Sequence, residues 1–124
     1  MTSADVLVRA TTARKYLEVG DIVMGSDPAD RQVAAGLAAL ASIAASDAIC
    51  GARLGFCAHG QDHGQAADLI ATVPGGPALA QSLRRVLRDK GNAHYGTSYL
   101  SIETVTAMLR HARALVDALD VHLR

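Results

Sequence analysis

The chain has 124 residues, half of them apolar, with twelve basic and twelve acidic side chains. This length suits one domain with one modest core, and the balanced charge excludes an overall field that attracts nucleic acid. No uninterrupted apolar run approaches the roughly 20 residues that span a bilayer. The N-terminus carries Asp5 and no apolar segment of the signal-peptide kind. We therefore expect a cytoplasmic protein whose contact with phosphate, if any, comes from a local patch.

Small side chains dominate the apolar part of the sequence. Only four residues are aromatic, and most of the apolar mass is Ala, Leu and Val. Alanine is the best helix former, and small side chains let helices approach closely although each buries little area. We predict an all-α fold, an up-and-down bundle of four to five helices, with a thin core that a larger assembly would help.

Two long helices are expected first. One runs from Ser3, as N-cap, to Met24, with Gly25 closing it. The next begins with Asp27 as cap and Pro28 in its first turn, and reaches about Phe56. Its predicted contact stripe consists of Val33, Leu37, Leu40, Ala44 and Gly51.

Three shorter or later helices complete the expected set. A loop over 59–64 leads to a short helix that is capped by Asp62 or His63 and ends near Val73. The run 74–77, Pro-Gly-Gly-Pro, is the clearest break, and a fourth helix follows from Ala78. The fifth starts at Ser101, and its apolar residues recur every three or four positions, which suits a bundle core or a dimer contact. That stripe consists of Ile102, Val105, Leu109, Ala112, Val116, Leu119 and Leu123.

Several polar residues have simple structural interpretations. Cys50 and Cys57 lie seven apart, about 10 Å on one helix, which is too far for a disulfide and predicts reduced thiols. Asp47 stands in an apolar stretch, so it faces solvent or pairs with Arg53 or with another helix. On the last helix we expect two surface residues, His111 and His122.

The loop histidines allow two further interpretations. His59 and His63 with Asp62 form a sparse set of metal-ligand types, but structural zinc takes four ligands, so a capping loop is the simpler account. Alternatively, Asp62 and His63 line the rim of the candidate site below. We predict no metal.

The densest basic patch lies at the end of the fourth helix and precedes a histidine. Four cations, Arg84, Arg85, Arg88 and Lys90, are offset by Asp89 alone. In an unbroken helix Arg88 and His94 lie about 120° apart, and Lys90 would face His94 instead. A break at Gly91-Asn92 would swing His94 back toward Arg88. The sequence leaves both geometries open.

An Arg–His pair supports a specific chemistry. A guanidinium stays charged and binds phosphate oxygens, while an imidazole titrates near neutrality and transfers protons. Together they suit phosphodiester cleavage without a metal ion.

The segment from Arg88 to Tyr95 resembles the signature of the HEPN superfamily, in which an Arg precedes a His by a short, variable gap and a polar residue often follows the Arg. Here the gap is five residues and Asp89 is the polar one. Residues 53–55, 60–63 and 93–96 also look like a compact bacterial HEPN family, and the order of the expected helices agrees with it.

The resemblance implies a homodimer that brings two motifs together across a cleft. Many such proteins are metal-independent endoribonucleases of toxin–antitoxin or defence systems, and others are non-catalytic modules that bind a nucleotide or a nucleotidyltransferase or antitoxin partner. Carried over, Arg88 and His94 are the catalytic pair, Asp89 orients Arg88, and no cofactor is needed. Tyr95 follows His94 directly, whereas the Tyr that a partner modifies in some toxin-type members lies two residues beyond the His. The residues expected to bind substrate are Arg84, Arg85, Lys90, Asn92, Tyr95 and His63.

Overall fold

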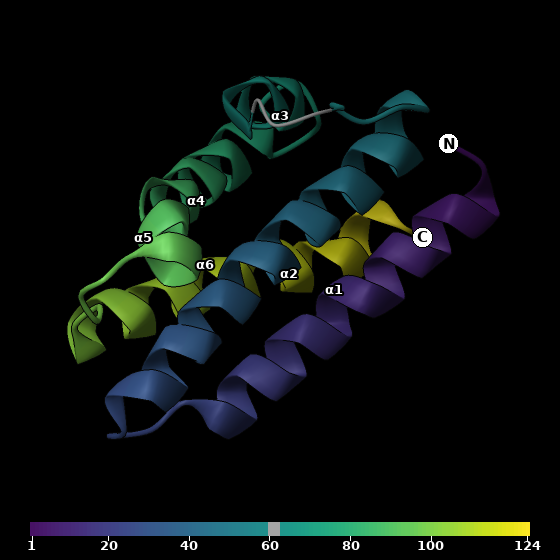
Figure 1. Ribbon diagram of the computed structural model, residues 1–124. Coiled ribbons are helices and arrows are strands. Elements are labelled where there is room, and N and C mark those ends of the chain that lie inside the picture. Colours follow the sequence, from purple (N-terminus) through teal and green to yellow (C-terminus); the bar gives the residue numbers. More distant parts are fainter. Residues whose placement is uncertain (60–62) are drawn as a thin grey trace.

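Figure 1 shows the computed structural model, which describes residues 1–59 and 63–124. All regular structure in these ranges is helical, as the composition predicts, and the expected all-α class is confirmed. The helices are α1 (Ser3–Val23), α2 (Pro28–Leu54), α3 (His63–Ile70), α4 (Gly76–Arg88), α5 (Lys90–Tyr95) and α6 (Ile102–His122). Five of them correspond to the predicted helices, and the short α5 is additional.

Helix α2 is the centre of the bundle. It runs antiparallel beside α1, α6 lies along both of them, and α3 lies near the end of α2 (Figure 1). Helix α2 contacts each of the other five helices. It is long and apolar enough to cross a membrane by composition, but most of that apolar stretch is buried within the bundle. Its burial is that of a core helix.

Alanines form most of the packed surface of α2. The predicted stripe was wrong in part, because Val33 is exposed and Leu37 and Leu40 are only half-buried. A helix surrounded by neighbours needs small residues on several sides, since each neighbour must approach its backbone closely. The fully buried alanines that meet this need are Ala34, Ala35, Ala38, Ala39, Ala41, Ala44, Ala45 and Ala48.

The helix starts follow the expected capping chemistry with one shift. The amides of Ala29 and Asp30 donate to the Asp27 carboxylate at 2.8 and 3.1 Å, as predicted. Helix α1, however, is capped by Thr2 instead of Ser3. The Thr2 hydroxyl accepts from the Asp5 amide at 3.1 Å, and the Asp5 carboxylate accepts from the Thr2 amide at 2.8 Å. Reciprocal bonds of this kind satisfy two amides at once, which favours Thr2.

The break before α4 depends on two glycines. Gly75 has a φ of +71°, which favours a residue without a side chain. A Cβ atom on Gly76 would collide with the backbone oxygen of Ile70. Because Gly76 joins the helix, α4 begins two residues before the predicted Ala78.

Two partly buried polar contacts connect α2 to its neighbours. Asp47 forms an ion pair with Arg9 of α1 at 3.0 Å, so its partner comes from another helix and not from Arg53. Burial raises the pKa of the Asp47 carboxyl, although Arg9 opposes this effect. Arg53 instead donates from Nε to Nδ1 of His122 at 2.8 Å. The prediction of a surface His122 was wrong, because this bond lets the ring lie buried beside α2.

The remaining apolar predictions agree with the packing. Most of the α6 stripe is buried, although Ile102 at its start is exposed. Cys50 and Cys57 are both free thiols, as expected. Burial and the nearby Asp47 raise the pKa of Cys50 to about 11, which makes it a poor nucleophile.

Candidate functional site

The chain turns between α4 and α5 at Asp89, two residues before the possible break at Gly91-Asn92. Helix α4 ends at Arg88, the Asp89 amide donates to the oxygen of Val86 at 3.2 Å, and α5 starts at Lys90. Gly91, where a break was one of the two open geometries, lies inside α5 with open space where a side chain would be. The break therefore exists, but its position places the whole segment from Lys90 to Tyr95 in a separate short helix.

His94 lies against the backbone of α2. A Cβ atom built on Gly36 would lie 3.2 Å from Cε1 of His94 and 3.5 Å from Nδ1. The imidazole therefore uses the space that the missing side chain of Gly36 leaves. His94 and Gly36 line a cavity of about 270 Å³ together with Val33, Leu37 and Leu40. His94 nevertheless remains exposed to solvent on its outer side.

One glutamine of α2 holds this corner in place. Gln32 donates from Nε2 to the backbone oxygen of Asn92, and its Oε1 accepts from the Leu100 amide at 3.0 Å. A single side chain thereby connects α5 and the segment before α6 to α2. Since no residue of α5 is buried, these bonds are a large part of what positions His94.

Arg88 lies on a different side of the corner. It lines a cavity of about 250 Å³ between α4 and α6, where its neighbours include Arg85, Asp89 and His111. The cavity beside His94 faces α2 instead. Within one chain the structure thus places the two residues of the expected catalytic pair on separate cavities.

Most of the other predicted site residues near this corner are exposed. Arg84 pairs with Asp68 of α3 at 2.8 Å, and both side chains are exposed. Lys90 is half-buried, while Asn92 is exposed and uses its backbone oxygen to accept from Gln32. The ring of Tyr95 is 86% exposed and lies 6.1 Å from the His94 ring, centre to centre.

His63 lies apart from this corner. It is the first residue of α3, and its charge affects Asp47. Asp47 and Gly36 are eleven residues apart on α2, about 16 Å along the helix axis. The structure therefore does not bring His63 to His94, and Asp62 lies outside the described residues. In residues 1–59 and 63–124, no group of three or more His, Cys, Asp or Glu side chains could hold a metal ion.

Sequence reasoning missed Gln32, Gly36 and His111. The first two stand in an alanine-rich helix more than fifty residues before His94, and nothing local distinguishes them. His111 was predicted to be a surface residue, but it is half-buried and its Nδ1 lies 3.2 Å from the Ser82 hydroxyl. The sequence shows the basic residues of α4, but it does not show that α6 crosses α4 beside them.

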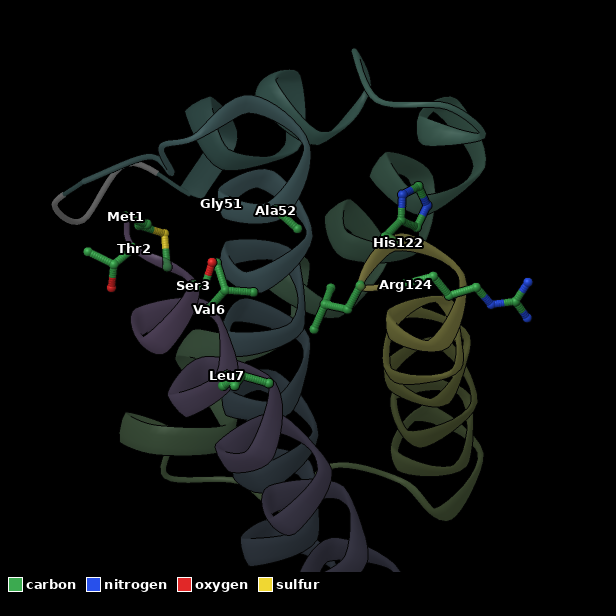
Figure 2. Close-up of a pocket in the computed structure, with 10 residues that line it drawn as sticks. Met1, Thr2, Ser3, Val6, Leu7, Gly51, Ala52, His122 and Arg124 are labelled. Carbon is green, nitrogen blue, oxygen red and sulfur yellow. The ribbon is translucent and has the colours of Figure 1, made fainter.

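A further cavity, of about 360 Å³, lies where the ends of α1, α2 and α6 meet (Figure 2). Met1 and Val6 approach Gly51 there, and His122 contributes to its wall. None of the predicted site residues lines it. The α4–α5 corner therefore remains the candidate site.

Comparisons with protein families, with curated proteins and with solved structures found no match.

Proposed function

We propose that this protein is a cytoplasmic HEPN-type endoribonuclease that acts as a homodimer, without a metal ion, in a toxin–antitoxin or defence system. One observation carries the proposal. An exposed imidazole, His94, is held against α2 by the short helix that follows the basic end of α4. There, Arg85 and Arg88 have no carboxylate within ion-pair distance among the described residues. Guanidiniums without an ion pair and an accessible imidazole, once brought together, suit binding and cleavage of a phosphodiester.

In the proposed reaction, His94 removes the proton of a ribose 2′-hydroxyl. The 2′-oxygen attacks phosphorus, the bond from phosphorus to the 5′-oxygen breaks, and a 2′,3′-cyclic phosphate forms. The leaving 5′-oxygen takes a proton, from the protonated imidazole of a second His94 or from water. Arg88 stabilises the negative charge that develops on the phosphoryl oxygens.

A second copy of the chain is part of this proposal. Because Arg88 and His94 line separate cavities in one chain, the pair must form between two copies. Large apolar side chains are exposed around His94. Val33 lines the same cavity as His94, and Tyr95 follows His94 in the chain. Tyr99 and Ile102 lie on either side of Leu100, whose amide donates to Gln32. Clustered exposed apolar residues are typical of protein interfaces, so a second copy would bury them.

The test is cleavage of end-labelled RNA by the purified protein in excess chelator. We expect cuts with cyclic phosphate ends, and their loss in both His94→Ala and Arg88→Ala. A mixture of these two variants should recover cleavage, because one composite site then contains an intact Arg88 and an intact His94. Cleavage that survives in His94→Ala would contradict the proposal.

A second candidate function follows from the same separation of Arg88 and His94. If the pair never meets, the chain is a non-catalytic HEPN module that binds a nucleotide or a nucleotidyltransferase or antitoxin partner. Absence of cleavage for a range of RNAs, by the wild type and by the mixture of variants, would favour this candidate.

A further inference from the structure

Helix α1 carries apolar residues on two opposite sides. The buried side, which packs on α2 and α6, consists of Val6, Ala10, Ala13, Leu17 and Gly20. On the other side, Val8 and Ile22 are 64% and 72% exposed. They lie seven residues before and seven residues after Lys15, and seven residues are close to two full turns, so all three lie on one line along the helix. The outer face of a surface helix is normally polar, so this line needs an explanation.

Ion pairs connect the two flanks of α1 to the rest of the bundle. Arg9 pairs with a carboxylate of α2, and Arg14 and Asp21 pair with charged residues of α6. The charged side chains that remain on the outer face are Lys15 and Glu18, which are both exposed and pair with each other at 2.7 Å. The outer face therefore has a balanced charge at its middle and an exposed apolar side chain toward each end.

This face matches itself when a second copy of α1 lies across it in the opposite direction. With the two Lys15 residues opposite each other, Val8 of each copy faces Ile22 of the other. Each Glu18 then lies about 4.5 Å along the axis from Lys15 of the other copy, so both lysines lie between two glutamates. The flexible lysine stems let the two ammonium groups move apart toward these carboxylates. A contact between identical surfaces requires such self-complementarity, in apolar side chains and in charge.

We propose that the outer face of α1 binds the same face of a second copy of the chain, antiparallel, with the two-fold axis at Lys15. The symmetry selects this occupant, because an unrelated partner does not require a face that repeats itself when reversed. Helix α1 lies on the side of α2 away from α5 (Figure 1), so the contact depends neither on the His94 corner nor on RNA cleavage. Two single helices bury less than the roughly 1,200–2,000 Å² of a standard interface, so we expect a weak contact at high protein concentration. If the corner dimer also forms, the α1 contact joins such dimers into larger assemblies.

Disulfide trapping with oxidised glutathione tests the geometry. All variants carry Cys57→Ser, and the remaining native thiol, Cys50, is buried. In the proposed contact two copies of Val8→Cys, or two of Ile22→Cys, place their thiols about 21 Å apart along the axis, whereas a disulfide needs Cα atoms within about 7 Å. Each variant alone should therefore stay uncross-linked, and an equimolar mixture of the two should form a covalent dimer. A mixture of Ile22→Cys with Val121→Cys, an equally accessible position on α6, is the control and should not cross-link.

Charge reversal tests the affinity, measured by sedimentation velocity on a Val33→Asp background so that the His94 corner does not contribute. Lys15→Glu places four carboxylates at the centre of the contact, and Glu18→Lys places four ammonium groups there. Each substitution should therefore raise the dissociation constant about tenfold or more. An equimolar mixture of the two should associate about as tightly as the background protein, because opposite charges face each other again.

Several results would overturn the proposal. One is the absence of a covalent dimer in the mixture of Val8→Cys and Ile22→Cys, and another is cross-linking of either variant with itself, which would indicate a parallel or random contact. A third is a mixture of Lys15→Glu and Glu18→Lys that associates as weakly as each variant alone. RNA cleavage should be unchanged in Lys15→Glu, and the trapped dimer should form equally well in a His94→Ala background, so this proposal and the proposed function fail separately.

Discussion

At the scale of single residues, the contact between His94 and Gly36 is the most informative. The Cβ atom of an alanine at position 36 would stand 3.2 Å from Cε1 of His94, which is closer than ordinary van der Waals contact. We predict that Gly36→Ala displaces the imidazole by a few tenths of an ångström and shifts its NMR signals. Because His94 is exposed on its other side, the ring can move, so the free energy of unfolding should change by less than about 1 kcal/mol.

Gly91→Ala is the matched control for that substitution. No atom lies within 4 Å of a Cβ atom built at position 91, and its φ is not positive. Replacing an exposed helical glycine by alanine should stabilise the fold by about 0.5–1 kcal/mol and leave the His94 signals in place. Equal shifts of His94 in both variants would show that the ring does not lie on Gly36.

At the scale of elements, α5 is the helix with the weakest packing. It has six residues and none is buried, and Gln32 supplies its bond to α2. Removing both hydrogen bonds in Gln32→Ala should cost about 1–3 kcal/mol locally and speed amide exchange in α5 and at Leu100. Exchange in α1 should stay unchanged. If α5 exchanges at the wild-type rate in this variant, Gln32 does not hold the corner.

The contact between α2 and α6 should make stability depend on pH. Burial, and then the charge of Arg53, lowers the pKa of His122 below its ordinary value of 6.5. Between the lowered pKa and about 6.5 the unfolded chain binds more protons than the folded one, so stability is lost as the pH falls through this window. His111 acts in the same direction.

The check is urea unfolding at pH 7.5 and pH 5.5. The wild type should lose stability at the lower pH, and His122→Gln should lose less, since it removes one of the two groups. The comparison uses the change between the two pH values within each protein, so a general destabilisation by the substitution does not affect it. An identical pH dependence in both proteins would contradict the assignment.

At the scale of the whole molecule, the proposed homodimer would cover the exposed apolar corner around His94. Val33 beside His94 and Val121 near the end of α6 are exposed to almost the same extent, 55% and 54%. If the corner is the dimer interface, Val33→Asp should shift sedimentation velocity toward the monomer, with a dissociation constant at least tenfold higher. Val121→Asp should leave it unchanged. A monomer at all concentrations in the wild type would contradict the homodimer.

The sequence by itself determined the helices and much of their ends. Asp27 with Pro28, the glycines at 75–76 and Ser101 carry local signals, because caps and breaks depend on a few adjacent residues. The same local reasoning placed the candidate site at the end of α4, but it left open whether the helix breaks at Gly91-Asn92 or continues, and the turn lies at Asp89. A turn tightened by one backbone bond has no clear signal in side-chain type.

Only the tertiary structure decided which side chains meet. The distances from Gln32 and Gly36 to His94, and from Arg88 to His111, depend on how α2 and α6 cross the α4–α5 corner. Alanine-rich helices carry little pattern to specify such crossings, because several of their faces are small enough to pack. The sequence could therefore name Arg88 and His94 as a pair, while the packing of their helices placed them on separate cavities.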